Sequence, residues 1–363
     1  MDFIPQIEPW IDENELKHLK RLVDNRYVVE NKLTAEFEQL VRDHTGSKHA
    51  ISVCNGTIAI YCCLKSLGIG EGDEVIVPNL TFIATANAVI MAGATPIFCD
   101  VDIDSMCIDY KLIESLITDR TKAVIPVHLY GNSVDLYPIM EICKRNSLRL
   151  IEDAAQGVGV LYDKKHVGTF GDCGILSYYG NKTITCGEGG IILTNDDEIA
   201  KQCYRLKNHG RDKKGIFIHE HIGYNFSFTE MQAAIGISQM EKLDRIIEKK
   251  KSIYDLYVKE LNGVGDLLPQ KFDSLTTPIH WFTSFLTENK NELSQYLLKN
   301  NIQTRDFFYP LDLQPCYKLT KDGKYENSHK LYKNGISLPS SYNLTNEQQI
   351  YVIDCIKKFY YNI

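Results

Sequence analysis

The stretch HAISVCNGTIAIYCCLKSLG, from His49 to Gly68, decides the fold class of this chain. Its first five residues form a short apolar run, which is typical of a buried strand. The turn "CNGT" follows directly, and the remaining residues, 58–68, have the pattern of a helix. A strand that leads through a short turn into a helix is the repeating unit of α/β proteins.

The same alternation continues along the chain. Further strand-like runs lie at 73–78, 95–102, 122–131, 148–156 and 174–179, and further helix-like segments at 82–93 and 136–145. Strands that alternate with helices favour a mostly parallel sheet covered by helices, with right-handed crossovers. We therefore expect an α/β fold.

The last third of the sequence has a different pattern. One long helix is expected from Phe228 to about Leu261, with apolar residues at three- and four-residue spacings and charge concentrated in its second half. Beyond it we expect a smaller α+β unit, built from the segments 277–286, 292–299, 302–310 and a final helix at 346–362. The long helix thus joins two predicted domains, a large one over 1–245 and a small C-terminal one over 246–363.

Composition narrows the classes of partner. The chain has 363 residues with 44% hydrophobic content, enough to bury a large core. Its net charge is -7, and it has neither a basic block nor an arginine-rich arm, so we expect no binding to nucleic acid or to an anionic membrane. Small molecules are the expected partners.

The cysteines indicate a reducing compartment. Eleven are scattered along the chain without a C-x-x-C pair, which argues for reduced thiols and against a zinc site. The first residues, "MDFIPQIEPW", do not resemble a signal peptide, and no stretch of about eighteen apolar residues occurs. We expect a cytoplasmic protein without a membrane segment.

An acid and an amine are expected to share one pocket. Ligands of α/β sheets bind at the carboxyl ends of the strands, and Asp153 and Lys182 each follow a strand-like run. Each residue also has a simpler reading, since aspartate at a strand end often caps a turn and lysine beside glycines is often solvated. The pair, rather than either residue, points to a ligand.

The "CNGT" junction adds a phosphate site. Asn55, Gly56 and Thr57 lie at the junction between the predicted strand and the predicted helix, where free N–H groups and the helix dipole favour an anion. Ser177 could donate a hydroxyl, and Phe82 could offer a flat apolar face, although each taken alone is as well explained as a core residue. Together with the amine and the acid, these groups would hold a phosphorylated, planar, nitrogen-containing aldehyde, which describes pyridoxal phosphate.

Motifs along nearly the whole chain identify a family. They are "LTAEFEQ", "NGT", "GDEVIVPNLTFIATANAV", "GATPIFCDVD", "IEDAAQ", "GNKTITCGEGG", "GYNFSFTEMQAAIG" and "TRDFFYPLDLQP". In these motifs the chain resembles the DegT/DnrJ/EryC1/StrS sugar-nucleotide aminotransferases. The resemblance implies the fold type I of pyridoxal-phosphate-dependent transferases, as in aspartate aminotransferase.

The resemblance also implies roles for matching residues. Lys182 would be the Schiff-base lysine, Asp153 the partner of the pyridine nitrogen, and Gln156 the neighbour of the ring hydroxyl. The remaining cofactor contacts would be Phe82 on the ring and, on the phosphate, Gly56, Thr57, Ser177 and Asn225. Asn225 would act across the interface of a homodimer with shared active sites. Relatives that remove a sugar hydroxyl have histidine in place of this lysine, so Lys182 favours transamination.

Two positions depart from the family pattern. Ser227 stands where relatives usually have arginine, and Asp312 where they have histidine. An anion near the substrate mouth would repel a diphosphate unless Arg305 or another cation offsets it. We expect Arg305 to pair with phosphate oxygens and Tyr309 or Tyr317 to stack or hydrogen-bond near the mouth. Both aromatic residues are equally well explained as part of the core of the small domain.

The expected reaction moves an amino group from glutamate to C4 of a nucleotide-linked 4-keto-6-deoxyhexose, for aminodeoxysugar and surface polysaccharide synthesis. Within the family, the C-terminal pattern most resembles members that make perosamine from GDP-4-keto-6-deoxymannose. The alternatives are amination at C3, transamination or dehydration of another keto substrate, and a non-catalytic binding or regulatory module.

Overall fold

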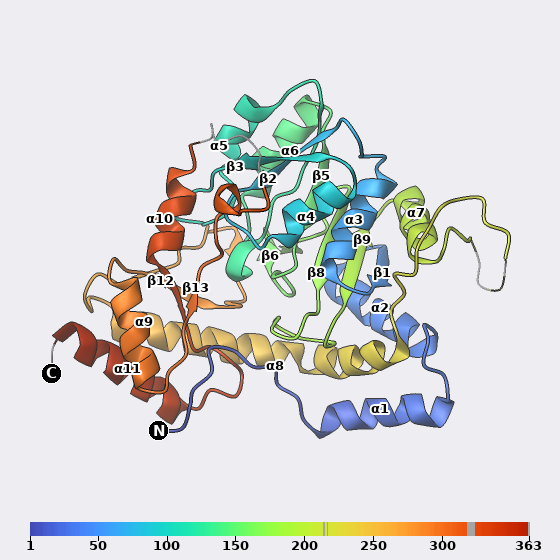
Figure 1. Ribbon diagram of the computed structural model, residues 1–363. Helices are drawn as coiled ribbons and strands as arrows, with labels where there is room; N and C mark the ends of the chain where they lie inside the picture. Colours follow the sequence, from blue (N-terminus) through green and yellow to red (C-terminus); the bar gives the residue numbers. More distant parts are fainter. Residues whose placement is uncertain (213–214, 216, 318–323, 362–363) are drawn as a thin grey trace.

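The centre of the molecule is a seven-stranded sheet in the order β1-β9-β8-β5-β4-β2-β3 (Figure 1). The computed structural model describes residues 1–212, 215, 217–317 and 324–361. The strands are β1 (His49–Val53), β2 (Glu74–Pro78), β3 (Thr95–Cys99), β4 (Thr121–Val124), β5 (Arg149–Asp153), β8 (Cys173–Ser177) and β9 (Gly190–Thr194). Neighbours from β8 to β3 run parallel, whereas β9 is antiparallel to both β8 and β1. The predicted mostly parallel sheet is confirmed.

Helices cover this sheet. They are α2 (Lys32–Thr45), α3 (Gly56–Ser66), α4 (Ala84–Met91), α5 (Tyr110–Ile113), α6 (Leu136–Arg145) and α7 (Asp197–Lys207), with short 3-10 turns η1 (Glu114–Leu116) and η2 (Leu129–Gly131). Helix α3 begins at Gly56, two residues before the predicted segment 58–68, because the Asn55 side chain accepts a hydrogen bond from the Ile58 N–H at 3.0 Å. This cap fixes the N-terminus of α3 next to the carboxyl end of β1.

The long helix α8 (Glu230–Leu261) connects the parts of the molecule. It begins after Thr229, which forms a capping box with Gln232, so it starts two residues later than predicted. In Figure 1 it runs below the sheet, with α1 (Glu13–Asn25) and α2 along one end. The role of α8 as an interdomain helix stays a prediction.

The C-terminal part is the expected smaller α+β unit. Its antiparallel sheet has the order β10-β12-β14-β13, and a third sheet has the order β11-β6-β7. The elements of the C-terminal part are β10 (Leu268–Pro269), β11 (Thr276–Thr277), β12 (Thr283–Leu286), β13 (Arg305–Asp306), β14 (Gly335–Leu338), α9 (Lys290–Lys299), α10 (Glu326–Asn334), α11 (Asn346–Tyr361) and η3 (Leu311–Leu313). In the third sheet, β11 pairs with a hairpin from the large part, β6 (Leu161–Tyr162) and β7 (Lys165–His166). The predicted last residue of the final helix, Asn362, lies outside the described residues.

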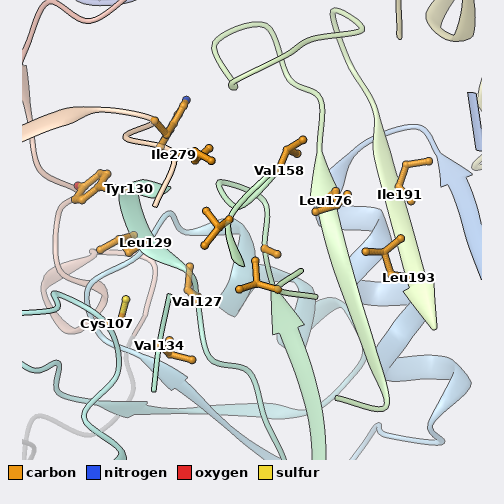
Figure 2. Close-up of a cluster of buried hydrophobic side chains, with 14 of the residues drawn as sticks. Cys107, Val127, Leu129, Tyr130, Val134, Val158, Leu176, Ile191, Leu193 and Ile279 are labelled. Carbon is orange, nitrogen blue, oxygen red and sulfur yellow. The ribbon is translucent and has the colours of Figure 1, made fainter. Parts of the chain in front are cut away.

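Apolar side chains form a core on each face of the large sheet and a third core in the C-terminal part. Figure 2 shows part of the first, from Leu176 and Ile191 on neighbouring strands to Tyr130 and Ile279. Ile4 belongs to the third core and bridges Ile302, so the first residues pack with the C-terminal part. The division predicted between 245 and 246 falls within α8 and stays a prediction.

Two general features bear on the surroundings of the protein. All eleven cysteines are free thiols. In the described part of the chain, none of the helices combines the length and the apolar character that a membrane crossing requires.

Candidate active site

A cavity of about 600 Å³ lies at the carboxyl ends of the parallel strands. Residues that directly follow β1, β2, β5 and β8 contribute to its wall, as expected for a ligand site of an α/β sheet. Of the residues predicted from sequence, the lining includes Gly56, Thr57, Phe82, Asp153, Gln156, Ser177, Lys182 and Arg305. The fold thus brings the predicted acid, amine and phosphate-binding residues together.

Asp153, the last residue of β5, is buried and held in one orientation. Its Oδ2 accepts a hydrogen bond from the Thr85 hydroxyl at 2.7 Å, and its Oδ1 accepts one from the Ala155 N–H at 3.1 Å. Burial raises the pKa of the carboxyl, while the two hydrogen bonds and Lys182 act in the opposite direction. A cationic nitrogen in the cavity would relieve this cost and would keep the carboxylate ionised.

Thr85 is a site residue that sequence reasoning missed. It lies on the first turn of α4, three residues after Phe82, and also lines the cavity. A hydroxyl within the mostly apolar run "FIATANAV", shortly after a strand end, was the available signal. The Thr85 hydroxyl lies 2.7 Å from the carboxylate of Asp153 but 3.4 Å from the main-chain oxygen of Phe82, so its main partner is the carboxylate.

The amine of Lys182 lies in the cavity without an ionic partner. Among the described residues, its Nζ forms neither a hydrogen bond nor an ion pair, and it sits 4.3 Å from the centre of the Trp281 ring. Burial lowers the pKa of Lys182 to about 8, with Asp153 opposing the shift and Arg305 adding to it. The amine therefore gives up its proton more readily than an exposed lysine does, although the protonated form still predominates at physiological pH. A lowered pKa of this kind suits a nucleophile or a proton carrier.

Trp281 is a second residue that sequence reasoning missed. It precedes β12, and its indole N–H donates a hydrogen bond to the main-chain oxygen of Asn181 at 2.8 Å. The cavity therefore has walls from both the large sheet and the C-terminal part. No spacing in the sequence relates residue 281 to residue 182, so this contact had no sequence signal.

The start of α3 and the end of β8 form a close-fitting anion cradle. The first N–H groups of a helix have no partner within the helix, and α3 starts at Gly56 and Thr57 on the cavity wall. A Cβ atom at Gly56 would lie 3.2 Å from the Cβ of Ser177, so glycine keeps this space open. The donors and the space fit a phosphate group.

Gln156 and Phe82 form further parts of the wall. The side-chain oxygen of Gln156 accepts a hydrogen bond from the Tyr130 N–H at 2.6 Å, which fixes the orientation of the amide. The Phe82 ring is 53% exposed, so its surface is available to a ligand. Its centre lies 5.8 Å from that of Phe308, another aromatic residue of the cavity wall.

Two predicted residues do not line the cavity of their own chain. Asn225 forms an isolated bridge with Asn208, and its side-chain oxygen accepts a weak hydrogen bond from the Ser227 N–H at 3.4 Å. Tyr309 is partly exposed, and its ring packs edge-on against Tyr332 with the centres 5.1 Å apart. The roles predicted for Asn225 and Tyr309 are not tested by this geometry.

Asp312 is also outside the cavity wall. Its Oδ1 accepts a hydrogen bond from the Asn79 side chain at 2.7 Å, and its Oδ2 lies 2.9 Å from Nε2 of His329. The carboxylate oxygens of Asp312 are thus occupied by neighbours within the chain, and the hydrogen bond from Asn79 ties η3 to the end of β2.

Comparisons with known proteins agree with this geometry. A protein named GDP-perosamine synthase from Escherichia coli O157:H7 is 39% identical over 364 residues, covering 99% of each chain. A Vibrio cholerae protein of the same name is 36% identical and covers 98% of this chain and 99% of its own. The crystal structure of S. venezuelae DesV, solved with a ketimine intermediate, matches with a TM-score of 0.95 at 30% identity over the whole of both chains.

The family model matches almost the entire chain. It covers residues 9–357 and describes the DegT/DnrJ/EryC1/StrS aminotransferase family. This span includes every residue of the cavity wall. The chain belongs to the DegT/DnrJ/EryC1/StrS aminotransferase family and is a pyridoxal-phosphate-dependent aminotransferase.

Proposed function

We propose that this enzyme transfers the amino group of glutamate to C4 of a nucleotide-linked 4-keto-6-deoxyhexose, with GDP-4-keto-6-deoxymannose as the first candidate. The observation that carries the proposal is the cavity in which an unpaired Lys182 lies with a buried Asp153 and an anion cradle. Full-length similarity to two proteins named GDP-perosamine synthase supports the choice of sugar. The product would be an aminodeoxysugar nucleotide for surface polysaccharide, such as O-antigen.

The residues of the cavity fit pyridoxal phosphate. Lys182 would bond to it, Asp153 would face its ring nitrogen, and Gln156 and Phe82 would contact its ring. The phosphate would occupy the cradle of Gly56, Thr57 and Ser177 at the start of α3. When bound, the cofactor supplies an electron sink for bonds at the substrate carbon. Lys182, as a neutral amine, would take and return the proton at that carbon.

Arg305 would recognise an anionic group of the substrate. Its guanidinium lies 5.3 Å from the centre of the Phe282 ring, and among the described residues it forms no ion pair. An unpaired arginine on a cavity wall suits phosphate or carboxylate oxygens. The proposed binding of a nucleotide diphosphate depends on this residue, and Tyr309 would act farther out at the mouth.

A homodimer with shared sites is part of the proposal. The segment that precedes Asn225 extends away from the body of the molecule in Figure 1 and carries apolar side chains that are 78–83% exposed, namely Phe217, Ile218 and Ile222. Apolar side chains exposed together mark a contact surface. A second copy would cover them and would bring its Asn225 to the phosphate. A cytosolic location is also proposed, and the eleven free thiols support it.

Product analysis tests the substrate. With glutamate as donor, the purified enzyme should aminate at least one of the GDP-, UDP- or dTDP-linked 4-keto-6-deoxy sugars, and NMR of the product should place nitrogen at C4. Nitrogen only at C3, or turnover only of ketones without a nucleotide, would contradict the proposed substrate. Borohydride reduction followed by peptide mapping tests the cofactor site separately, because the label should be on Lys182.

Subunit mixing tests the shared site. An inactive Lys182→Ala protein mixed with a weakened Asn225→Ala protein should give heterodimers with one intact site, so activity should rise on mixing. Mass spectrometry would verify subunit exchange. Exchange without any gain over the separate variants would show that Asn225 does not act across the interface.

A further inference from the structure

Helix α8 carries a buried lysine that the proposed reaction does not use. The Nζ of Lys250 donates hydrogen bonds to the main-chain oxygens of Trp281 and Ser340, both at 3.0 Å. In the part of the chain that the structure describes, no carboxylate lies within ion-pair distance of this amine. Burial lowers the pKa of Lys250 to about 7. A neutral amine has two N–H groups, and both are matched here by carbonyl oxygens.

The residue held by Lys250 reaches the cavity. The main-chain oxygen of Trp281 accepts from Lys250, the indole N–H donates to the main-chain oxygen of Asn181, and the indole face lies 4.3 Å from the Nζ of Lys182. One side chain on α8 is therefore connected to the cofactor lysine through a single intervening residue.

The turn before Trp281 is held in an unusual conformation by the same helix. His280 has a backbone φ of 49°, in the left-handed region that residues other than glycine rarely adopt. Its ring stacks on that of Tyr254, one helical turn after Lys250, with the ring centres 3.9 Å apart. Helix α8 thus contacts the turn at two points. Lys250 binds the main-chain oxygen of Trp281, and Tyr254 stacks on the ring of His280.

The other side of this turn leaves little room for movement. The N–H of Ile279 donates to the oxygen of Gly131 at 3.2 Å, and a Cβ atom at Gly131 would lie 2.7 Å from the nitrogen of Trp281. Figure 2 shows Ile279 and Tyr130, the neighbour of Gly131, in the same buried cluster. The position of the indole is consequently set between η2 on one side and α8 on the other.

We propose that Lys250 is a positioning residue, which keeps the indole face of Trp281 against the amine of Lys182 by holding the main chain at Trp281. Without Lys250, two buried carbonyl oxygens would lose their donors, and the turn would shift to satisfy them. The face of an indole ring attracts a cation. The contact therefore stabilises the protonated form of the group at Lys182. The inference rests on the proposed role of Lys182.

The test measures a property of the bound cofactor other than turnover. The absorbance of enzyme-bound pyridoxal phosphate is recorded against pH for wild type, Lys250→Met and Trp281→Leu. Loss of the indole contact should lower the midpoint of the titration by about half a pH unit. We expect the same downward shift in both single variants. The double variant should show no further shift, because both changes remove the same contact between the indole of Trp281 and the group at Lys182.

Lys242→Met provides the matched control. Lys242 is a buried lysine on the same helix, but its partners are Glu15 and Asp12, and it has no contact with Trp281. This variant should lose stability and keep the wild-type midpoint. Asp153 and Arg305, the charged groups that act on Lys182, are unchanged in all variants.

The outcomes separate this inference from the proposed function. A Lys250→Met protein that loses stability but keeps the wild-type midpoint would overturn the positioning role, as would fully additive shifts in the double variant. If Lys250→Met does not fold, Lys250→Gln retains a donor and should give a smaller shift in the same direction, with an unchanged midpoint again contradicting the inference. Borohydride labelling of a lysine other than Lys182 would instead refute the proposed cofactor site.

Discussion

The cavity and the seam between α1 and α8 each contain a buried lysine, and the two lysines have opposite surroundings. Lys242 at the seam is fully buried and lies 2.7 Å from Glu15 and 3.2 Å from Asp12. Lys182 in the cavity has no ionic partner among the described residues, and its pKa falls to about 8 because of burial. The same side chain thus anchors a helix in one region and stays reactive in the other.

The partner carboxylate at the seam explains the difference. Burial alone would raise the pKa of Glu15, but hydrogen bonds from the Asp12 N–H and from the side chains of Lys242, Gln239 and Ser238 lower it to about 2. The seam therefore holds a fixed charge pair at every ordinary pH. The cavity keeps its amine and its acid apart, so each can respond to a ligand.

The largest effect should come from removing the cavity lysine. Lys182→Ala should lower turnover by on the order of 10³-fold or more, because both the covalent attachment and the proton carrier are lost. The variant should still bind the cofactor through Asp153 and the anion cradle, and its melting temperature should stay near that of wild type. Steady-state kinetics and cofactor content measure the two effects. Turnover within tenfold of wild type would contradict the role of Lys182.

Removing the seam lysine should have the opposite profile. Lys242→Met leaves Glu15 buried without its cation, so the free energy of unfolding should fall by about 3–5 kcal/mol, while turnover per folded molecule stays unchanged. Denaturant titration measures the loss. A double variant that also carries Glu15→Gln should recover much of the stability. Loss of turnover in correctly folded Lys242→Met would contradict the expectation that Lys242 contributes to stability alone.

Acid should weaken the seam between α1 and α8. The pKa of Glu15 is lower in the folded chain than its ordinary value of 4.5, so the resulting stability is present above about pH 4.5 and is lost as the pH falls toward about 2. The expected loss is on the order of 3 kcal/mol. Unfolding curves between pH 6 and 3 should show a smaller decrease for Glu15→Gln than for wild type, and parallel curves would contradict this.

A smaller effect should show whether the affinity for pyridoxal phosphate depends on the space at Gly56 in the anion cradle. Gly56→Ala would place a Cβ atom 3.2 Å from the Cβ of Ser177, at the edge of the phosphate site. Its affinity for pyridoxal phosphate should fall about tenfold with little change in stability. Gly180→Ala is the matched control, because the nearest atom to its added Cβ is 3.9 Å away. Equal affinities of the two variants would show that the cradle is not tight.

Sequence could predict the side of the cavity that belongs to the parallel sheet. Asp153 and Ser177 end strands, and Lys182 follows one, so a parallel order is enough to bring them to one edge. Trp281 and Lys250 could not be found in this way. Their contacts join segments far apart in the chain, and they depend on how the C-terminal part packs on α8, which no local periodicity encodes.

The predicted contact of Asn225 has a different status. Its position on an exposed segment is visible in one chain, but its proposed target lies on another, so neither the sequence pattern nor the geometry of a single chain determines the distance. Asp312 shows the converse case. The sequence marked it as a charge near the substrate, and the packing of α10 supplied His329 as a neighbour that no pattern had indicated.

The bridge between Ile4 and Ile302 has a consequence for the order of events during synthesis. The N–H of Ile4 donates to the main-chain oxygen of Asn301, and the main-chain oxygen of Gln6 accepts from the N–H of Ser340. Ile4 and Gln6 therefore find these partners only after about three hundred further residues have been made. At about 5–20 residues per second, a ribosome needs roughly 15–60 s to make the intervening three hundred residues. During that time Ile4 is without its native partner, so its apolar side chain stays outside the core that it joins in the finished fold.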